Sequence, residues 1–452
     1  MVRIFPFNGI TYNPDMIKNL SKVMAPPYDV ISPEEQDQLY NLHDYNVIRL
    51  ILGKEFAEDT NYNNKYIRAA KYFEGFLLHK IMTRSEKPCL YVYEQTFIHN
   101  RKKHKRIGLI SLLRLEDFGK GKVFPHEETF PKAKTDRLSL LHHTYANFES
   151  IFSIFSDTKL KMTKYLKKFT KRKPLIQAKD KDKVIHKIWA IDKKSALKKI
   201  MRDMKDKWVF IADGHHRYEA ALKFKDEVKE KTQRFSEEEP YNYILMYFTP
   251  IEDKGLLVLP IHRVVKINLD NFDPIQFEGS LHNHFKVEVL PFKKSNEKRV
   301  RAKLFKLLEK NKDDQHSFGV YMGGNKYLRL TLKDEKLIDE FITDNKPKTW
   351  KKLDVNVLHT FVIDMLLGIK KGSHEAENNI KYVKSEDLAV DLVNQGKYGV
   401  AFFLNPTSVK DIIYIASKYE KMPQKSTYFY PKLLSGLVLN KIDLKEKIKD
   451  EL

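Results

Sequence analysis

The chain has 452 residues, of which 42% are hydrophobic and 12% aromatic, with 17 glycines and 18 prolines. Length and composition together exclude collagen-like, low-complexity and wholly disordered chains, and they allow two or three globular domains. The 82 Lys and Arg residues outnumber the 60 Asp and Glu residues, giving a formal charge of +22, so polyanions and phosphorylated metabolites must be considered as partners.

Most of this positive excess is lysine, scattered over stretches such as 159–174 and 193–207. We interpret it as a solvated surface, with polyanion binding as the alternative. The single cysteine, Cys89, has no internal partner for a disulfide, which is typical of a reducing compartment. The first residues lack the apolar segment of a signal peptide, and no apolar run reaches the roughly 18 residues that cross a bilayer. We expect a soluble, cytoplasmic protein without a membrane partner.

The N-terminal region begins with a short strand in residues 2–7 and continues into the proline-rich loop APPYDV at 25–30. Ser32 as N-cap and Glu35 three residues later form a capping-box pattern, so a helix begins here. We therefore expect an ordered loop that displays Asp29 beside a helix N-terminus. A turn shaped merely by its prolines is the alternative.

The middle of the chain predicts an amphipathic helix at 64–83, followed by an antiparallel hairpin of strands at 89–100 and 105–115. Helices are expected at 136–145, 157–171 and 193–206. An apolar strand at 208–212 then runs into a turn at Gly214 and a helix from about residue 216.

The C-terminal part mixes expected strands with expected helices. The strands are at 241–249, 255–265, 285–290, 326–332 and 398–404, and the helices at 299–310, 354–366 and 408–418. This alternation favours an α+β (mixed α/β) fold over one doubly wound sheet. We predict an N-terminal part at 1–265 and a C-terminal α/β part at 266–452.

Several familiar sequence motifs of enzymes are incomplete in this chain. The glycines at 319–324 continue into Asn325-Lys326 rather than the Lys-Ser/Thr of a Walker A loop, and the DFG tripeptide at 117–119 has no kinase catalytic loop. The histidine pairs lack the spacing of an HExxH zinc site. The sequence therefore predicts neither a P-loop enzyme, a protein kinase nor a zinc enzyme.

Residues 213–217 read Asp-Gly-His-His-Arg at the joint between the expected strand and helix. The backbone N–H groups of a helix N-terminus bind phosphate, the Arg217 guanidinium adds a cationic fork, and the His215 and His216 rings can donate hydrogen bonds. Asp213 would repel an anion, so it indicates a bound cation or a proton-accepting task. A capped helix with surface histidines is the alternative.

A second box, FPHEET at 124–129, is followed by Lys132, Lys134, Asp136 and Arg137. The proline favours an extended segment that displays Glu127. A carboxylate beside cations stays ionised and could accept a proton from an alcohol. A solvated loop is the alternative.

The box DGHHRYEAAL at 213–222 resembles the phosphate-binding box of the ParB/sulfiredoxin superfamily, in the version found in free-serine kinases, and PHE at 125–127 resembles the general-base box of those kinases. Further boxes along the chain resemble one large, mostly bacterial family, the pyrophosphate-dependent serine kinases or diphosphate–serine phosphotransferases. They lie at 25–32, 45–53, 136–137, 146–148, 256–263, 353–359, 400–407 and 422–438. The resemblance implies a ParB/sulfiredoxin-like core with additional N- and C-terminal α/β segments.

The resemblance also implies an activity: phosphorylation of free L-serine to O-phospho-L-serine, a step of serine metabolism and cysteine biosynthesis, with Mg²⁺ as cofactor and pyrophosphate as donor. Glu127 would deprotonate the hydroxyl and Asp213 would place the metal. Gly214, His215, His216 and Arg217 would hold the donor phosphates, with the last two stabilising the transferring group. The pocket would be completed by Asp29, Lys132, Asp136, Arg137 and Asn147. The polar residues 424–427 would either close the site or form a buried hairpin.

Two alternatives stay open. The donor could be ATP or ADP on the same fold. A ParB-like nucleotide-binding protein that binds DNA would suit the charge of +22, but strands rather than a helix-turn-helix follow residues 213–217, so we expect no nucleic acid partner. The sequence leaves the oligomeric state open.

Overall fold

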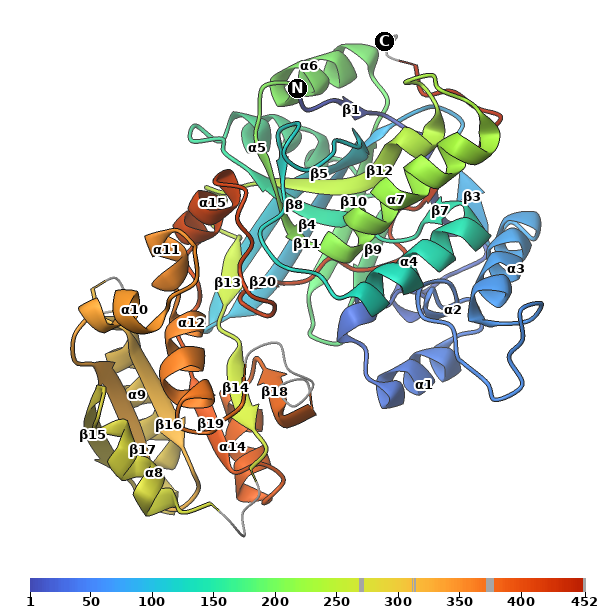
Figure 1. Cartoon of the computed structure of the whole chain (residues 1–452). Coiled ribbons are helices and arrows are strands. Elements are labelled where there is room, and N and C mark those ends of the chain that lie inside the picture. The colour runs from blue at the N-terminus through green and yellow to red at the C-terminus, as the bar shows by residue number, and fades with distance from the viewer. Residues whose placement is uncertain (268–271, 311, 313, 371–377, 450–452) are drawn as a thin grey trace. The chain divides into compact units, whose positions relative to one another are not determined.

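The computed structural model describes the chain except for residues 268–271, 311, 313, 371–377 and 450–452 (Figure 1). By packing, the described chain divides into two compact units. Unit 1 comprises residues 1–125, 129–257 and 429–452, and unit 2 comprises residues 126–128 and 258–428. The mixed α/β class is confirmed, because both units combine helices with sheets. The domain boundary expected at 265/266 stays a prediction.

Unit 1 is built on a mixed nine-stranded sheet with the order β6-β11-β8-β12-β5-β4-β10-β9, and β1 lies beside β5. The pairs β6–β11 and β8–β12 are parallel, and the other neighbours are antiparallel. The strands are β1 (Ile4–Phe5), β4 (Leu90–His99), β5 (Lys102–Arg114), β6 (Val123–Phe124), β8 (Ile151–Phe155), β9 (Ile176–Lys179), β10 (Ile185–Ile191), β11 (Val209–Asp213) and β12 (Tyr243–Pro250).

The helices of unit 1 are, in chain order, α1 (Pro33–Leu42), α2 (Ile48–Ile51), α3 (Lys65–Leu78), α4 (Pro131–Thr144), α5 (Lys161–Leu166), α6 (Lys194–Met204) and α7 (His215–Thr232), with short 3₁₀ turns at Leu20–Lys22, Tyr28–Val30, Phe169–Lys171 and Pro240–Asn242. Helices α5, α6 and α7 contact the large sheet. Helix α4 packs against α3 and α7, and Figure 1 shows α4 and α7 running side by side. One apolar cluster joins the sheet to the helices, with Ile211 of β11, Ile200 of α6 and Phe224 of α7 among its members.

Two strand pairs lie outside the large sheet of unit 1. β2 (Ile10–Tyr12) pairs with β3 (Met82–Arg84), and β7 (Ala146–Asn147) pairs with β21 (Asn440–Lys441). The second pair matters for the site, because it brings the C-terminal segment of the chain beside Asn147. Strands β13 (Leu257–Leu259) and β20 (Tyr428–Tyr430) lie where the chain passes from one unit to the other.

Local predictions were partly confirmed. Ser32 caps α1 by accepting a hydrogen bond from the backbone N–H of Glu35 at 3.2 Å, but the Glu35 carboxylate pairs with Lys181 instead of completing a capping box. The helix expected at 64–83 ends at Leu78, because residues 82–84 pair as a strand with the distant β2. The helix expected at 157–171 is reduced to α5 and a 3₁₀ turn.

Unit 2 is built on a six-stranded antiparallel sheet with the order β15-β17-β16-β19-β14-β18. Its strands are β14 (His262–Val265), β15 (Phe285–Pro291), β16 (Ser317–Tyr321), β17 (Lys326–Leu332), β18 (Ile380–Val383) and β19 (Val400–Phe403). Its helices are α8 (Pro274–Leu281), a 3₁₀ turn (Lys294–Asn296), α9 (Glu297–Lys310), α10 (Lys336–Phe341), α11 (Lys348–Lys351), α12 (Asp354–Leu358), a π-helical segment (His359–Asp364), α14 (Glu386–Asn394) and α15 (Val409–Ser417). In the part of the chain that the structure describes, no helix is both long and apolar enough to span a bilayer.

Candidate functional site

The strand–turn–helix joint expected at residues 213–217 is present in unit 1. β11 ends at Asp213, the backbone turns at Gly214, and the 18-residue helix α7 begins at His215. Gly214 has φ +95° and ψ 28°, a conformation that L side chains rarely adopt, so glycine is required at this turn. The pairing of β11 with β8 shifts register between Ile211 and Asp213, an irregularity that re-aims the end of the strand.

Arg217 folds back over this turn from the first turn of α7. Its Nη1 donates to the carbonyl oxygen of Ser150 at 2.9 Å, and its Nη2 lies 3.2 Å from Oδ2 of Asp213. Burial alone would lower the pKa of Arg217, but the nearby carboxylates of Glu149 and Asp213 raise it. The guanidinium is therefore a permanent cation beside the helix N-terminus.

His215 and His216, the two histidines of residues 213–217, both lie against neighbouring parts of unit 1. His215 is buried at the start of α7. The Nε2 atom of His216 accepts a hydrogen bond from the backbone N–H of Phe130 at 2.9 Å, and the two rings stack with centroids 6.3 Å apart. Because Nε2 is the acceptor, a neutral His216 ring carries its proton on Nδ1.

Asp213 is held by two cations. Besides Arg217, it pairs with Lys432, which comes from the C-terminal segment 219 positions along the chain. The side chains of Asp213 and Lys432 are only 14% and 12% exposed. Lys432 was not among the residues expected from sequence. It lies within the box at 422–438, but the sequence singled out the polar residues 424–427 instead.

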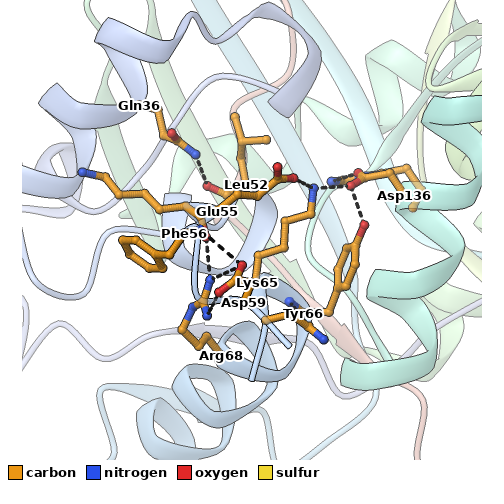
Figure 2. Close-up of polar contacts among 12 residues, drawn as sticks. Gln36, Leu52, Glu55, Phe56, Asp59, Lys65, Tyr66, Arg68 and Asp136 are labelled. Carbon is orange, nitrogen blue, oxygen red and sulfur yellow. Dashed lines mark hydrogen bonds and ion pairs between the residues drawn. The ribbon is translucent and has the colours of Figure 1, made fainter. Parts of the chain in front are cut away.

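A second cluster of charges lies where α3 meets α4 (Figure 2). Asp136 receives Lys65 Nζ at 2.6 Å and the Tyr66 hydroxyl at 2.8 Å, and it also pairs with the adjacent Arg137. Although burial would raise the pKa of Asp136, Arg137 and Lys65 together lower it to about 2. Figure 2 shows Lys65 bridging Asp136 and Glu55, so the cluster fixes the N-terminal part of α4 that carries Arg137.

Glu149 links three distant segments and was missed by the sequence analysis. Its Oε1 accepts the backbone N–H of Tyr28 at 3.2 Å and the hydroxyl of Ser435 at 3.0 Å, and its Oε2 lies 3.9 Å from Arg137. The Arg137 guanidinium sits 3.9 Å above the Tyr28 ring. The proline-rich loop is thereby ordered, as expected. Its sequence signal was limited to its place directly after the box at 146–148.

The remaining expected residues of unit 1 are placed less centrally. Asn147 lies in β7, where its side-chain oxygen accepts from Asn440 at 3.2 Å. Asp29 is exposed in the 3₁₀ turn that starts at Tyr28, and its charge raises the pKa of Arg217. Lys132 is exposed at the start of α4. A cavity of about 40 Å³ brings four of the site's side chains together: Arg137, Asn147, Glu149 and Arg217.

Glu127 belongs to unit 2 by packing. Its Oε1 accepts the backbone N–H of Lys425 at 2.8 Å, and its Oε2 lies 3.4 Å from the Thr427 hydroxyl. The buried His126 ring contacts that hydroxyl at 2.9 Å. Lys425 and Thr427, two of the polar residues 424–427, thus hold the carboxylate of Glu127, and the oriented carboxylate is suited to accept a proton.

In the described ranges, no group of three or more His, Cys, Asp or Glu side chains is arranged to hold a metal ion. At the turn, Asp213 at the end of β11 offers a carboxylate ligand. Mg²⁺ commonly takes one or two carboxylates and completes its shell with water and substrate phosphates. A single carboxylate therefore fits a metal that arrives with a phosphorylated donor better than a resident metal centre.

Three solved structures are similar to this chain at low identity. A conserved hypothetical protein from Pyrococcus furiosus shares 13% identity, covers 72% of this chain and 93% of its own, and has a TM-score of 0.31. A free serine kinase in complex with AMP shares 11% identity, covers 72% and 89%, and has a TM-score of 0.31. SbnI from Staphylococcus aureus, with a C-terminal truncation, shares 11% identity, covers 70% and 82%, and has a TM-score of 0.29.

No curated protein matches this chain. A protein-family model, described as a protein of unknown function (DUF1015), matches residues 4–356, which is more than half of the chain. The matched range includes β11, the Gly214 turn and α7. The chain belongs to the DUF1015 family.

Proposed function

We propose that this protein transfers a phosphoryl group from inorganic pyrophosphate to the hydroxyl group of free L-serine, releasing O-phospho-L-serine and orthophosphate. The observation that carries the proposal is the Gly214 turn, where Arg217 and Lys432 flank Asp213 at the N-terminus of an 18-residue helix. Backbone N–H groups and two cations converge there, and phosphoryl transfer needs this concentration of positive charge.

The donor would bind at the turn. The N–H groups at the start of α7 and the Arg217 guanidinium would contact the phosphate oxygens and stabilise the charge that develops during transfer. His216, with its proton on Nδ1, would donate a further hydrogen bond to a phosphate oxygen. Bound Mg²⁺ would neutralise charge on the donor phosphates, and Asp213 is the residue that would hold it.

The acceptor hydroxyl must lose a proton as it attacks. We assign this proton to Glu127, whose carboxylate is oriented by the backbone of Lys425 and the hydroxyl of Thr427. The assignment rests on the resemblance of the PHE box and on this local geometry within unit 2. Asp213 and Asp29 are the competing carboxylates.

Free L-serine as the acceptor is supported by the resemblance to free-serine kinases. The cavity of about 40 Å³ beside Arg137, Asn147, Glu149 and Arg217 is smaller than a free amino acid requires, because one water molecule alone takes about 30 Å³ in the liquid.

The test is an assay of the purified protein with L-serine and Mg²⁺, supplied in parallel with pyrophosphate, ADP or ATP. Mass spectrometry would detect O-phosphoserine, and a colorimetric assay would measure orthophosphate. We expect product with pyrophosphate. Product only with ADP or ATP would make the enzyme a nucleotide-dependent serine kinase, and no product with any donor would refute the serine assignment.

A further inference from the structure

The positive charge of the chain is concentrated on one segment of unit 1. Residues 159–207 contain 19 Lys and Arg against 5 Asp and Glu, so this segment carries a net charge of +14 out of the chain's +22. The rest of the chain, which is far longer, shares the remaining +8. A solvated lysine surface does not require such a concentration, which instead marks a candidate surface for binding anions.

The structure brings the two lysine-rich parts of this segment together. The first part forms α5 and the 3₁₀ turn that follows it, and the second part forms α6. Leu166 of α5 and Ile200 of α6 belong to one apolar cluster. The centroid of the Tyr165 ring lies 5.2 Å from Nζ of Lys199 and 5.5 Å from Nζ of Lys168. Cations from both parts therefore meet at one aromatic ring.

Helix α6 separates its apolar residues from its basic residues. Lys194, Lys198 and Arg202 are exposed and follow one another at intervals of four residues. Residues four apart lie on the same side of a helix, about 6 Å apart along its axis, so these three form a row of cations. The buried residues of α6 are Ala196, Leu197, Ile200 and Met204. The first part of the segment adds further exposed cations: Lys161, Lys164, Lys167, Lys168, Lys171 and Arg172.

Few carboxylates neutralise these charges. In the part of the chain that the structure describes, three of the 19 Lys and Arg residues of the segment form ion pairs. Lys181 pairs with Glu35, and Asp203 is shared by Lys199 at 2.6 Å and Arg202 at 3.7 Å. A dense group of cations with so few counter-charges attracts polyanions from solution.

A nucleic acid suits this surface better than a membrane does. A helix that lies on a membrane inserts its apolar side between the lipids. The apolar side of α6 is already buried in the core of unit 1, so it is not available for insertion. A phosphate backbone needs no apolar contact, because the Lys and Arg side chains that displace its counterions supply essentially all of the non-specific affinity.

We propose that the surface formed by α5, the 3₁₀ turn after it and α6 binds a nucleic acid through its phosphate backbone, without reading the bases. The proposal departs from the expectation of no nucleic acid partner, which was based on the lack of a helix-turn-helix after residues 213–217. It is independent of the proposed serine kinase activity, because the residues proposed for catalysis and substrate binding all lie outside 159–207.

The test measures binding of a fluorescently labelled DNA duplex and of a labelled single-stranded RNA by anisotropy. We expect binding at about 50 mM salt that weakens steeply toward about 200 mM. A variant combining Lys164→Gln, Lys168→Gln, Lys194→Gln and Lys198→Gln should bind at least about tenfold more weakly at about 50 mM salt. For the duplex, the slope of log K against log salt should fall in magnitude by about 2 to 4, because each lost phosphate contact removes about 0.9.

The matched control combines Lys298→Gln, Lys303→Gln, Lys306→Gln and Lys310→Gln on α9 of unit 2, where all four lysines are also exposed. It changes the net charge of the protein by the same amount, so it separates a local surface from an effect of total charge. Its affinity should stay within about threefold of that of the unchanged protein. Equal losses in the two variants would overturn the proposal, as would a failure of the unchanged protein to bind either oligonucleotide.

Vesicles containing phosphatidylserine are tested in parallel by sedimentation. Binding to these vesicles without binding to either oligonucleotide would assign the surface to a membrane and overturn the nucleic acid. If the variant with four changes does not fold, the pair Lys164→Gln and Lys168→Gln and the pair Lys194→Gln and Lys198→Gln are made separately. Each pair should then show part of the loss, and unchanged binding in both would overturn the proposal. Oligonucleotide binding is measured without serine or pyrophosphate, so its outcome is separate from that of the kinase assay.

Discussion

Gly214→Ala adds one methyl group at the centre of the candidate site, and the structure shows what that group would contact. The backbone there has φ +95°, so an alanine costs about 1–2 kcal/mol of stability. The added Cβ would lie 2.9 Å from Nη2 and 3.0 Å from Cζ and Nε of Arg217. The neighbour is the end of a flexible side chain, so we expect the fold to survive while the guanidinium moves away from Asp213 and the Ser150 carbonyl.

If Arg217 stabilises the transferring phosphoryl group, this displacement removes a positioned donor. Such a loss costs about 2–4 kcal/mol in the transition state, which corresponds to a decrease in kcat of about 30- to 1000-fold. The assay is O-phosphoserine formation at saturating substrates, with thermal unfolding measured on the same samples.

Gly119→Ala is the matched control. Gly119 has φ +82°, but an added Cβ would meet nothing within 4 Å, so the variant reproduces the backbone strain without the contact to Arg217. Both variants should lose similar stability, and only Gly214→Ala should lose most of its activity. Equal activities in the two variants would refute the role of the turn.

Three further changes test other parts of the account. Glu127→Gln keeps the side chain's shape but removes its proton-accepting group, so kcat should fall by at least about a hundredfold with little change in pyrophosphate affinity. If Glu127→Gln stays active while Asp213→Asn or Asp29→Asn is inactive, the general base is that aspartate and not Glu127. The pKa of Asp136, about 2, lies below its usual unfolded value of about 3.9, so its ion pairs stabilise the fold above pH 4 and this stabilisation is lost toward pH 2. The stability difference between the unchanged protein and Asp136→Asn, on the order of 2 kcal/mol by urea unfolding at pH 7, should therefore shrink as the pH falls to 2, and a constant difference would contradict the assignment. Arg106→Met leaves two backbone carbonyl groups without their buried donor, so we expect a loss of about 2–5 kcal/mol in urea unfolding, and a change below about 0.5 kcal/mol would show that the C-terminal segment does not depend on it.

Elements whose sequence pattern lies within a few consecutive residues could be predicted from the sequence alone. The end of β11, Gly214 and the start of α7 are contiguous, so strand, turn and helix could be predicted together. Ser32 could be predicted as a cap for the same reason. β8 was missed, because Ile151–Phe155 is buried along its whole length and shows no polar alternation, although it lies between β11 and β12.

The rest of the site depends on pairings that no local pattern carries. Lys432 pairs with Asp213 in a C-terminal segment whose backbone carbonyl groups accept hydrogen bonds from Arg106 and Gln95 of the sheet. Glu149 becomes part of the site through Tyr28 and Ser435, which lie far from it on either side in sequence. A short sequence motif such as residues 213–217 can be recognised locally. The charged side chains that pair with it, here Lys432 and Glu149, come from distant segments and could not be predicted from the motif.

The central claim is a transfer from pyrophosphate to serine, and ³¹P NMR of a single reaction tests it directly. The protein is mixed with L-serine, Mg²⁺ and pyrophosphate, and the three phosphorus species are followed together. The account predicts that the pyrophosphate signal decays while O-phosphoserine and orthophosphate appear in equal amounts, and that Arg217→Ala slows all three changes alike. Orthophosphate without phosphoserine, or pyrophosphate that persists unchanged, would contradict it.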